Sequence, residues 1–170
     1  PARWNILAQQ TLMAQNSQLP FKQDADVRIW TDGWDGYPLA RQRLLESLAT
    51  SGASNPVVLS GDVHSFFAAE ISRYPTKAAT RNNQVLASEF CGTSITSPSR
   101  PQKRTEEYVA INPGIKYGKS DQRGFMLLDV TPETTTAHFQ ALADVQDAGS
   151  GIATAASFVV RNGRAEVVKA

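Results

Sequence analysis

Asp62 and His64 are the residues whose types and spacing are best suited to chemistry. They follow the apolar run 56–59, from which Ser60 and Gly61 separate them. In an extended chain, residues two apart point to the same side, so both side chains could face one cation. A carboxylate oxygen and a neutral imidazole nitrogen are ordinary ligands for zinc, iron or manganese. The alternative, which these two residues by themselves favour, is that Asp62 caps a turn and His64 packs as a hydrogen-bonded side chain.

A second group of candidate residues lies in segment 29–38, which is rich in aromatic side chains, aspartates and glycines. A surface connection rarely carries several large aromatic rings unless they line something, because such rings are costly to expose to water. Trp30 and Trp34, with Asp32 and Asp35 beside them, therefore predict a ligand-binding loop. The alternative is that the two indoles fill the edge of the core, since aromatic rings are often buried.

The elements that must position Asp62 and His64 are a helix and a buried strand. Leucines recur at helical spacing after Pro38, a good first-turn residue, and Gly52 is a good stop signal. The apolar residues 56–59 then predict a strand covered on both faces. A helix followed by a buried strand is half of a βαβ unit, and in open α/β sheets reactive groups gather beyond the carboxyl ends of such strands.

The remaining pattern predicts further strands and several connections. Segment 65–71 is apolar enough to be buried, but its period does not separate strand from helix. Asn-Gly at 162–163, between two apolar runs, predicts a hairpin. The other expected strands span residues 4–8, 85–91, 124–130, 134–142, 156–160 and 165–168. The expected connections are a loop or short helix at 9–26, a polar loop at 72–84, a long loop at 98–122 and a flexible stretch at 148–156.

The overall composition is that of one globular domain with a sizeable core. The 170 residues carry 17 basic and 16 acidic side chains, a formal charge of +1, which gives no electrostatic case for nucleic-acid binding. No apolar run approaches the about 20 residues of a membrane span. The single cysteine, Cys91, excludes an internal disulfide. Because the chain starts at Pro1 rather than at methionine, we expect it to begin inside a longer polypeptide.

Five motifs in register resemble the PhoD-type alkaline phosphatases, which belong to the calcineurin-like metallophosphoesterases. They read WNILAQQ, WDGYP with a following arginine, LSGDVHS, EFCGTSITS and RGF, and they cover nearly the whole chain to about residue 131. The resemblance implies an α/β (α+β) fold, the C-terminal half of a β-sandwich flanked by helices, with antiparallel C-terminal strands. It also implies that residues 1–170 are the C-terminal part of a single domain, whose N-terminal part is absent from this chain.

The resemblance assigns candidate catalytic residues and metal ligands. Gly61 to His64 stand where most metallophosphoesterases have Gly-His-x-His, so Asp62 replaces the first histidine, consistent with a harder cation such as Ca²⁺. His64 would then hold the transition metal, with Fe³⁺ implied by the family. Asp35 is a weaker candidate ligand, because the Trp-Asp-Gly-Tyr loop recurs in the family. The other ligands would come from outside this chain, and Cys91 is expected in the core.

The implied function is metal-dependent hydrolysis of phosphate mono- and diesters, with residues 1–170 inactive by themselves. The implied location is periplasmic or secreted. The expected partners are a phosphate ester and either the missing N-terminal half or a second copy that covers the same apolar face. The alternative is a non-catalytic β-rich binding module, or an inactive fragment, whose aromatic loop near Trp30 and Trp34 holds a ligand. His138 has no acidic neighbour in sequence and is expected at a rim or in the core.

Overall fold

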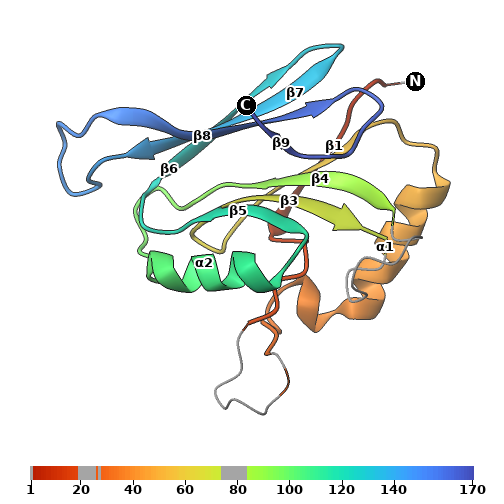
Figure 1. The fold of residues 1–170 in the computed structure, drawn as a ribbon, viewed down its shortest axis with the longest axis horizontal. Coiled ribbons are helices and arrows are strands. Elements are labelled where there is room, and N and C mark those ends of the chain that lie inside the picture. Colours follow the sequence, from red (N-terminus) through yellow and green to blue (C-terminus); the bar gives the residue numbers. More distant parts are fainter. Residues whose placement is uncertain (1, 19–25, 27, 74–83) are drawn as a thin grey trace.

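The structure is a computed structural model that describes residues 2–18, 26, 28–73 and 84–170. Two β-sheets lie face to face, and helices cover the outer face of the larger sheet (Figure 1). This arrangement is the β-sandwich flanked by helices that the family resemblance implies. No helix among the described residues is long and apolar enough to cross a membrane.

The larger sheet, in the described part of the chain, has five strands in the order β1-β2-β4-β3-β5. The bounds are β1 Asn5–Thr11, β2 Pro56–Gly61, β3 Phe66–Ser72, β4 Val85–Cys91 and β5 Ile115–Lys119. Strands β1, β2 and β4 run parallel, whereas β3 and β5 run antiparallel to their neighbours. The 3₁₀ turn η1 (Trp34–Gly36) and helix α1 (Pro38–Thr50) connect β1 to β2. The predicted helix, buried strand and βαβ unit are therefore confirmed.

The smaller sheet is antiparallel, in the order β6-β7-β8-β9. Its bounds are β6 Gly124–Val130, β7 Thr134–Leu142, β8 Ile152–Arg161 and β9 Val168–Lys169. The chain does reverse at Asn162-Gly163, where Gly163 has a φ of 79°, so that β8 and β9 pair. The connection between them is longer than a two-residue turn, and the predicted strand at 165–168 is wrong for residues 165–167, because β9 begins only at Val168. The expected flexible stretch 148–156 is wrong for its second half, because β8 already begins at Ile152 and pairs with β7 there.

Aromatic rings fill the space between the two sheets. Phe66 of β3 stacks on Phe139 of β7 with ring centroids 4.8 Å apart, and Phe139 also contacts Phe158 of β8 at 5.7 Å. Such ring pairs add to the stabilisation from apolar burial. A second core lies on the opposite face of the larger sheet. Leu45 of α1 and Val109 of a later helix, α2 (Gln102–Ile111), contribute to this core. One sheet therefore separates two cores.

The predicted long loop at 98–122 is wrong, because this segment contains helix α2 (Gln102–Ile111) and strand β5. Helix α2 offers no apolar repeat, since its fully buried side chains are Thr105 and Tyr108. It packs by close approach to Gly118 of β5, where a Cβ would stand 2.7 Å from Thr105 and 2.8 Å from Phe67. A missing side chain on the strand, rather than an apolar stripe on the helix, makes room for this contact.

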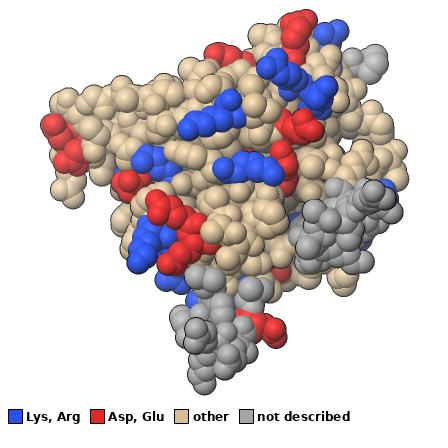
Figure 2. Space-filling model, viewed as in Figure 1, with Lys and Arg blue, Asp and Glu red and all other residues tan. Residues whose placement is uncertain are grey.

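Two other expected segments also need adjustment. Gln9 to Thr11 belong to β1 rather than to a loop, and residues 12–18 contain no helix. Residues 19–25 and most of the predicted polar loop, 74–83, lie outside the described residues. Segment 65–71, whose period is ambiguous, forms strand β3. On the face of the molecule in Figure 2, basic and acidic side chains are interspersed, in keeping with the net charge of +1.

Candidate functional site

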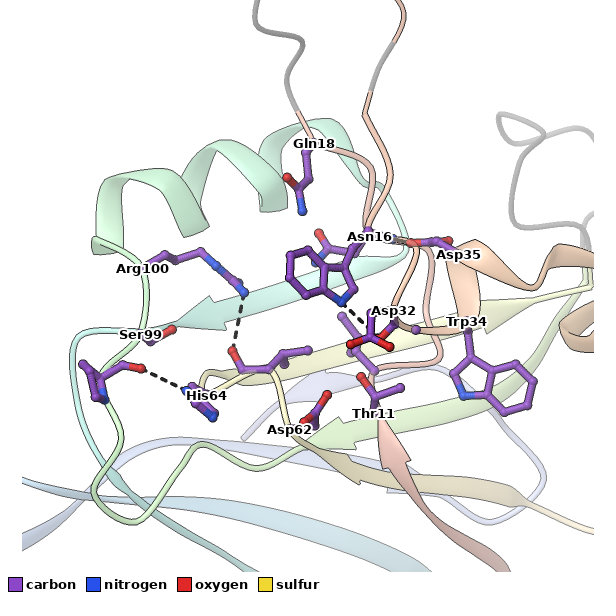
Figure 3. A pocket seen from close by; sticks show the side chains of 15 residues that line it. Thr11, Asn16, Gln18, Asp32, Trp34, Asp35, Asp62, His64, Ser99 and Arg100 are labelled. Carbon is purple, nitrogen blue, oxygen red and sulfur yellow. Dashed lines mark hydrogen bonds between the residues drawn. The ribbon is translucent and has the colours of Figure 1, made fainter.

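A pocket of about 480 Å³ lies beyond the carboxyl ends of the three parallel strands (Figure 3). Strands β1, β2 and β4 all end at this edge of the sheet, and the segments that follow them form its walls. Open α/β sheets place their ligands at such an edge. The lining residues come from four segments, 11–18, 30–35, 62–64 and 98–100.

The loop that carries Asp62 and His64 is sharply folded rather than extended. Asp62 has a φ of 66° and His64 a φ of 55°, both in the region that favours glycine. The Val63 amide donates to the Gly61 carbonyl oxygen at 2.7 Å, which closes a γ-turn centred on Asp62. The expectation that an extended chain aligns the two side chains is therefore wrong. They line one pocket because of two unusual backbone conformations, of the kind that gathers at functional sites.

The contacts of His64 leave one ring nitrogen available as a ligand. Nδ1 lies 2.9 Å from the carbonyl oxygen of Pro98. A carbonyl oxygen only accepts, so Nδ1 carries the proton, and in a neutral ring the lone pair is then on Nε2. Metal-binding histidines are usually oriented by such a hydrogen bond from the other nitrogen. His64 therefore has the tautomer of a metal ligand.

Asp62 offers a free carboxylate beside this imidazole. Its side chain is exposed and makes no hydrogen bond or ion pair with any other described residue. An oxygen and a nitrogen donor in one pocket fit a divalent or trivalent cation. Within the described part of the chain, however, no group of three or more His, Cys, Asp or Glu residues is placed to hold a metal. The assignment of Asp62 and His64 as metal ligands therefore stays a prediction, and in it the pair would supply only part of the ligand set.

Asp35 also lines the pocket, but protein donors use both of its oxygens. Arg41 Nη1 donates to Oδ1 at 2.7 Å, and the backbone N–H of Asn16 donates to Oδ2 at 3.0 Å. Arg41 also donates to the Met13 carbonyl oxygen at 3.2 Å, and both charged side chains are buried. Asp35 lies in the 3₁₀ turn η1, which ends at Gly36. A glycine is needed there, because a Cβ would overlap the backbone of Thr31. The role of Asp35 as a metal ligand stays a prediction, and its contacts favour a positioning role.

The Asp35–Arg41 pair predicts a large loss of stability for Asp35→Asn. The change leaves the buried Arg41 guanidinium without its counter-charge, so we expect the free energy of unfolding to fall by about 3–5 kcal/mol. Asp129→Asn is the matched control, because Asp129 is 67% exposed and its pairing with His138 contributes about 1 kcal/mol or less. Urea unfolding of the two variants measures the difference, and equal effects would contradict a stabilising role of the buried Asp35–Arg41 pair.

The two tryptophans of the aromatic loop have different surroundings. Trp34 is partly buried against the core, and its Nε1 donates to Gln9 Oε1 at 3.0 Å. Trp30 is 56% exposed at the pocket, with its Nε1 donating to the Asp32 carbonyl oxygen at 3.1 Å. Core filling therefore describes Trp34, whereas Trp30 is placed to contact a ligand.

Glu89 and Arg100 are the important residues near the site that the sequence reading does not single out. Glu89 is fully buried on β4 and accepts hydrogen bonds from the amides of Met13 and Ala14 at 2.8 and 2.7 Å. Ser60, at the end of β2, also donates to it at 2.7 Å. Burial raises the pKa of Glu89, and these hydrogen bonds oppose the rise. A carboxylate in a strand of mostly apolar residues is the signal that could have identified it.

Cys91 and His138 do not line the pocket. Cys91 is fully buried, and burial raises the pKa of its thiol, which confirms it as a core residue. His138 lies on the outer face of the smaller sheet, where its Nδ1 is 2.7 Å from the hydroxyl oxygen of Ser157. Its Nε2 is 3.2 Å from Asp129, an acidic neighbour supplied by the adjacent strand. His138 therefore lies on a partly exposed sheet face rather than in the core.

Comparison with known proteins places this architecture in a family. The sequence model described as PhoD-like phosphatase matches residues 1–139, which is most of the chain. The chain belongs to the PhoD-like phosphatase family. The resemblance seen in the five motifs is thus confirmed.

Two members of the PhoD-like family show how much of the whole protein this chain represents. It is 35% identical over 161 residues to alkaline phosphatase D of Bacillus subtilis (strain 168), covering 93% of this chain and 26% of that protein. The solved "Structure of PhoD" superposes with a TM-score of 0.84 and 32% identity, covering 99% of this chain and 31% of that one. The mixed α/β fold with an antiparallel C-terminal sheet is therefore confirmed. The chain spans about a quarter to a third of the length of these relatives.

Proposed function

We propose that this chain forms part of the active site of a metal-dependent phosphoesterase that hydrolyses phosphate mono- and diesters. The observation that carries the proposal is the arrangement of Asp62 and His64. A free carboxylate and an imidazole with an available Nε2 face one pocket at the carboxyl ends of the parallel strands. Membership in the PhoD-like phosphatase family supports the reaction type.

The two donors suit two kinds of cation. The Asp62 carboxylate is a hard oxygen ligand of the type that Ca²⁺ prefers, and the His64 imidazole suits Fe³⁺ or another transition metal. Metal ions bound there would supply Lewis-acid stabilisation of the phosphate and activation of water. The chain's own residues set the geometry. Pro98 holds the ring of His64 through Nδ1, and the γ-turn directs the Asp62 carboxylate into the pocket.

The remaining ligands would come from residues beyond this chain, in our proposal from the N-terminal part of the same domain. Strands β1 and β6 lie at the edges of their sheets in the described structure. Ile6 on β1, and Phe125 and Leu127 on β6, expose apolar side chains that such a part, or a second copy, could cover. A periplasmic or secreted location, which the family resemblance implies, belongs to the same proposal.

The test compares the intact protein with residues 1–170 alone. We expect the intact protein to hydrolyse p-nitrophenyl phosphate and its bis ester in a chelator-sensitive way, and to contain metal. Residues 1–170 should show no turnover above background, because two side chains do not hold a catalytic metal cluster against water. Chelator-sensitive turnover by residues 1–170 would contradict the partial site. An intact protein with neither metal nor turnover would contradict the phosphoesterase assignment.

A second candidate function is a non-catalytic binding module, and the exposure of Trp30 favours it. An indole that is 56% exposed at a pocket can stack on a flat ligand group. A binding module of this kind needs no metal, whereas the phosphoesterase needs a transition metal together with a harder cation. Metal analysis of the intact protein therefore separates the two candidates directly.

A further inference from the structure

Arg100 is a cationic side chain that lines the pocket, and the proposed phosphoesterase function gives it no role so far. We propose that Arg100 is a substrate-binding residue that holds the anionic oxygens of the phosphate group beside Asp62 and His64. This inference rests on the proposed function, because it takes the ligand of the pocket to be a phosphate ester. It assigns to the segment before helix α2 a direct role in binding the reacting group.

Three contacts hold segment 98–100 against the loop at the end of β2. The Pro98 carbonyl oxygen accepts from His64 Nδ1 at 2.9 Å, and the hydroxyl oxygens of Ser99 and Ser65 are 2.9 Å apart. Arg100 Nη2 donates to the carbonyl oxygen of Val63 at 3.4 Å, as Figure 3 shows. The guanidinium therefore reaches the residue that stands between Asp62 and His64.

The donors of Arg100 are largely unused by the protein. Its Nη1 is buried and has no hydrogen-bond partner among the described residues, and its one bond to Val63 is long. No described carboxylate forms an ion pair with it, and burial lowers the pKa of its guanidinium. Arg123, a buried arginine just before β6, differs because Ser94, Ser97 and Ser120 accept its hydrogen bonds. Arg100 is thus a partly buried cation whose Nη1 has no acceptor among the described residues, and an anion bound in the pocket would supply one.

The surroundings of Arg100 favour a phosphate oxygen as that anion. The guanidinium carbon lies 5.2 Å from the centroid of the buried Tyr108 ring, a cation–π contact that helps to hold the side chain at the pocket. A planar fork of N–H groups matches two oxygens of a phosphate, and such charge-assisted contacts are the stronger hydrogen bonds. The cation-binding pair Asp62 and His64 lines the same pocket as Arg100, so in this proposal one phosphate group meets both.

The test is Arg100→Gln in the intact, metal-loaded protein, with Arg104→Gln as the matched control. Arg104 also lies over the Tyr108 ring, at 5.9 Å, and bonds its hydroxyl oxygen, but it does not line the pocket. In R100Q we expect the KM for p-nitrophenyl phosphate and the inhibition constant of inorganic phosphate to rise about 10- to 100-fold, the loss typical of a charged hydrogen bond. In R104Q both constants should stay within about twofold of wild type.

A second measurement keeps the inference independent of turnover. Inorganic phosphate at a fixed concentration should raise the melting temperature of the wild type, R104Q and, in part, R100K, which keeps the charge but not the fork. R100Q should lose most of this shift with its metal content unchanged. An unchanged phosphate inhibition constant in R100Q, or a loss of metal from it, would overturn the binding role. Failure of the proposed function would give a different result from failure of the Arg100 role, because the wild-type protein itself would then show no chelator-sensitive hydrolysis.

Discussion

Replacing His64 by alanine in the intact protein is expected to reduce chelator-sensitive hydrolysis of p-nitrophenyl phosphate by about 100-fold or more. His64 donates through Nδ1 to Pro98 and so keeps Nε2 for a cation. Loss of a group that merely supports a metal ligand costs about 10- to 100-fold in affinity or activity, and loss of the ligand itself should cost at least as much. The transition-metal content should fall in parallel, and Asp62→Asn should lower turnover in the same direction.

His138→Ala is the control for this experiment. His138 lies on the outer face of the smaller sheet, where its ring bonds Ser157 and Asp129 and does not line the pocket. We expect its activity and metal content to match the wild type. Circular dichroism should show that both histidine variants keep the fold, since neither side chain is fully buried. Normal turnover and metal content in H64A would exclude His64 as a ligand.

Glu89→Gln is expected to lower the free energy of unfolding by about 2–4 kcal/mol. Both oxygens of the wild-type carboxylate accept backbone amides, from Met13 on one and from Ala14 on the other. A glutamine presents an NH₂ group to one of these donors, so a buried backbone amide loses its acceptor. Because Glu89 also accepts from Ser60, the change should loosen the segments that follow both β1 and β2.

The same substitution has a defined pH dependence. Burial raises the folded-state pKa of Glu89 above its usual value of 4.5, so the folded protein holds this proton to a higher pH than the unfolded chain does. The contribution of the group to stability is therefore fully present below pH 4.5 and is lost as pH rises through the folded-state pKa. The stability advantage of the wild type over E89Q should thus be largest at acidic pH and should decrease toward neutrality.

Glu133→Gln is the matched control for Glu89. Its side chain is 75% exposed and lies 3.9 Å from the exposed Arg3, a pairing that contributes little. Urea unfolding of wild type, E89Q and E133Q at several pH values measures both effects in one series. Equal stabilities of E89Q and E133Q with parallel pH profiles would show that the Glu89 carboxyl group does not anchor the segments that follow β1 and β2.

Local sequence patterns were sufficient to predict a helix or strand where that element buries a continuous apolar surface. Helix α1 begins at Pro38 and the buried strand β2 begins at Pro56, as the leucine spacing and the apolar run predict. Helix α2 could not be predicted in this way, since it packs through Thr105, Tyr108 and the space above Gly118. Its position depends on a strand that comes later in the chain, and residue spacing within the helix does not record such a contact.

The sequence by itself determined the candidate pair Asp62 and His64 and the family, because residue types and their order along the chain are enough for both. Only the tertiary structure decided how these residues can act. The γ-turn replaced the extended geometry, and Pro98, 34 residues from His64, selected the nitrogen that is available. Arg100 reached the same pocket from the same distant segment. The physical reason is that proton position, charge compensation and side-chain direction depend on partners brought together by folding, which no local spacing specifies.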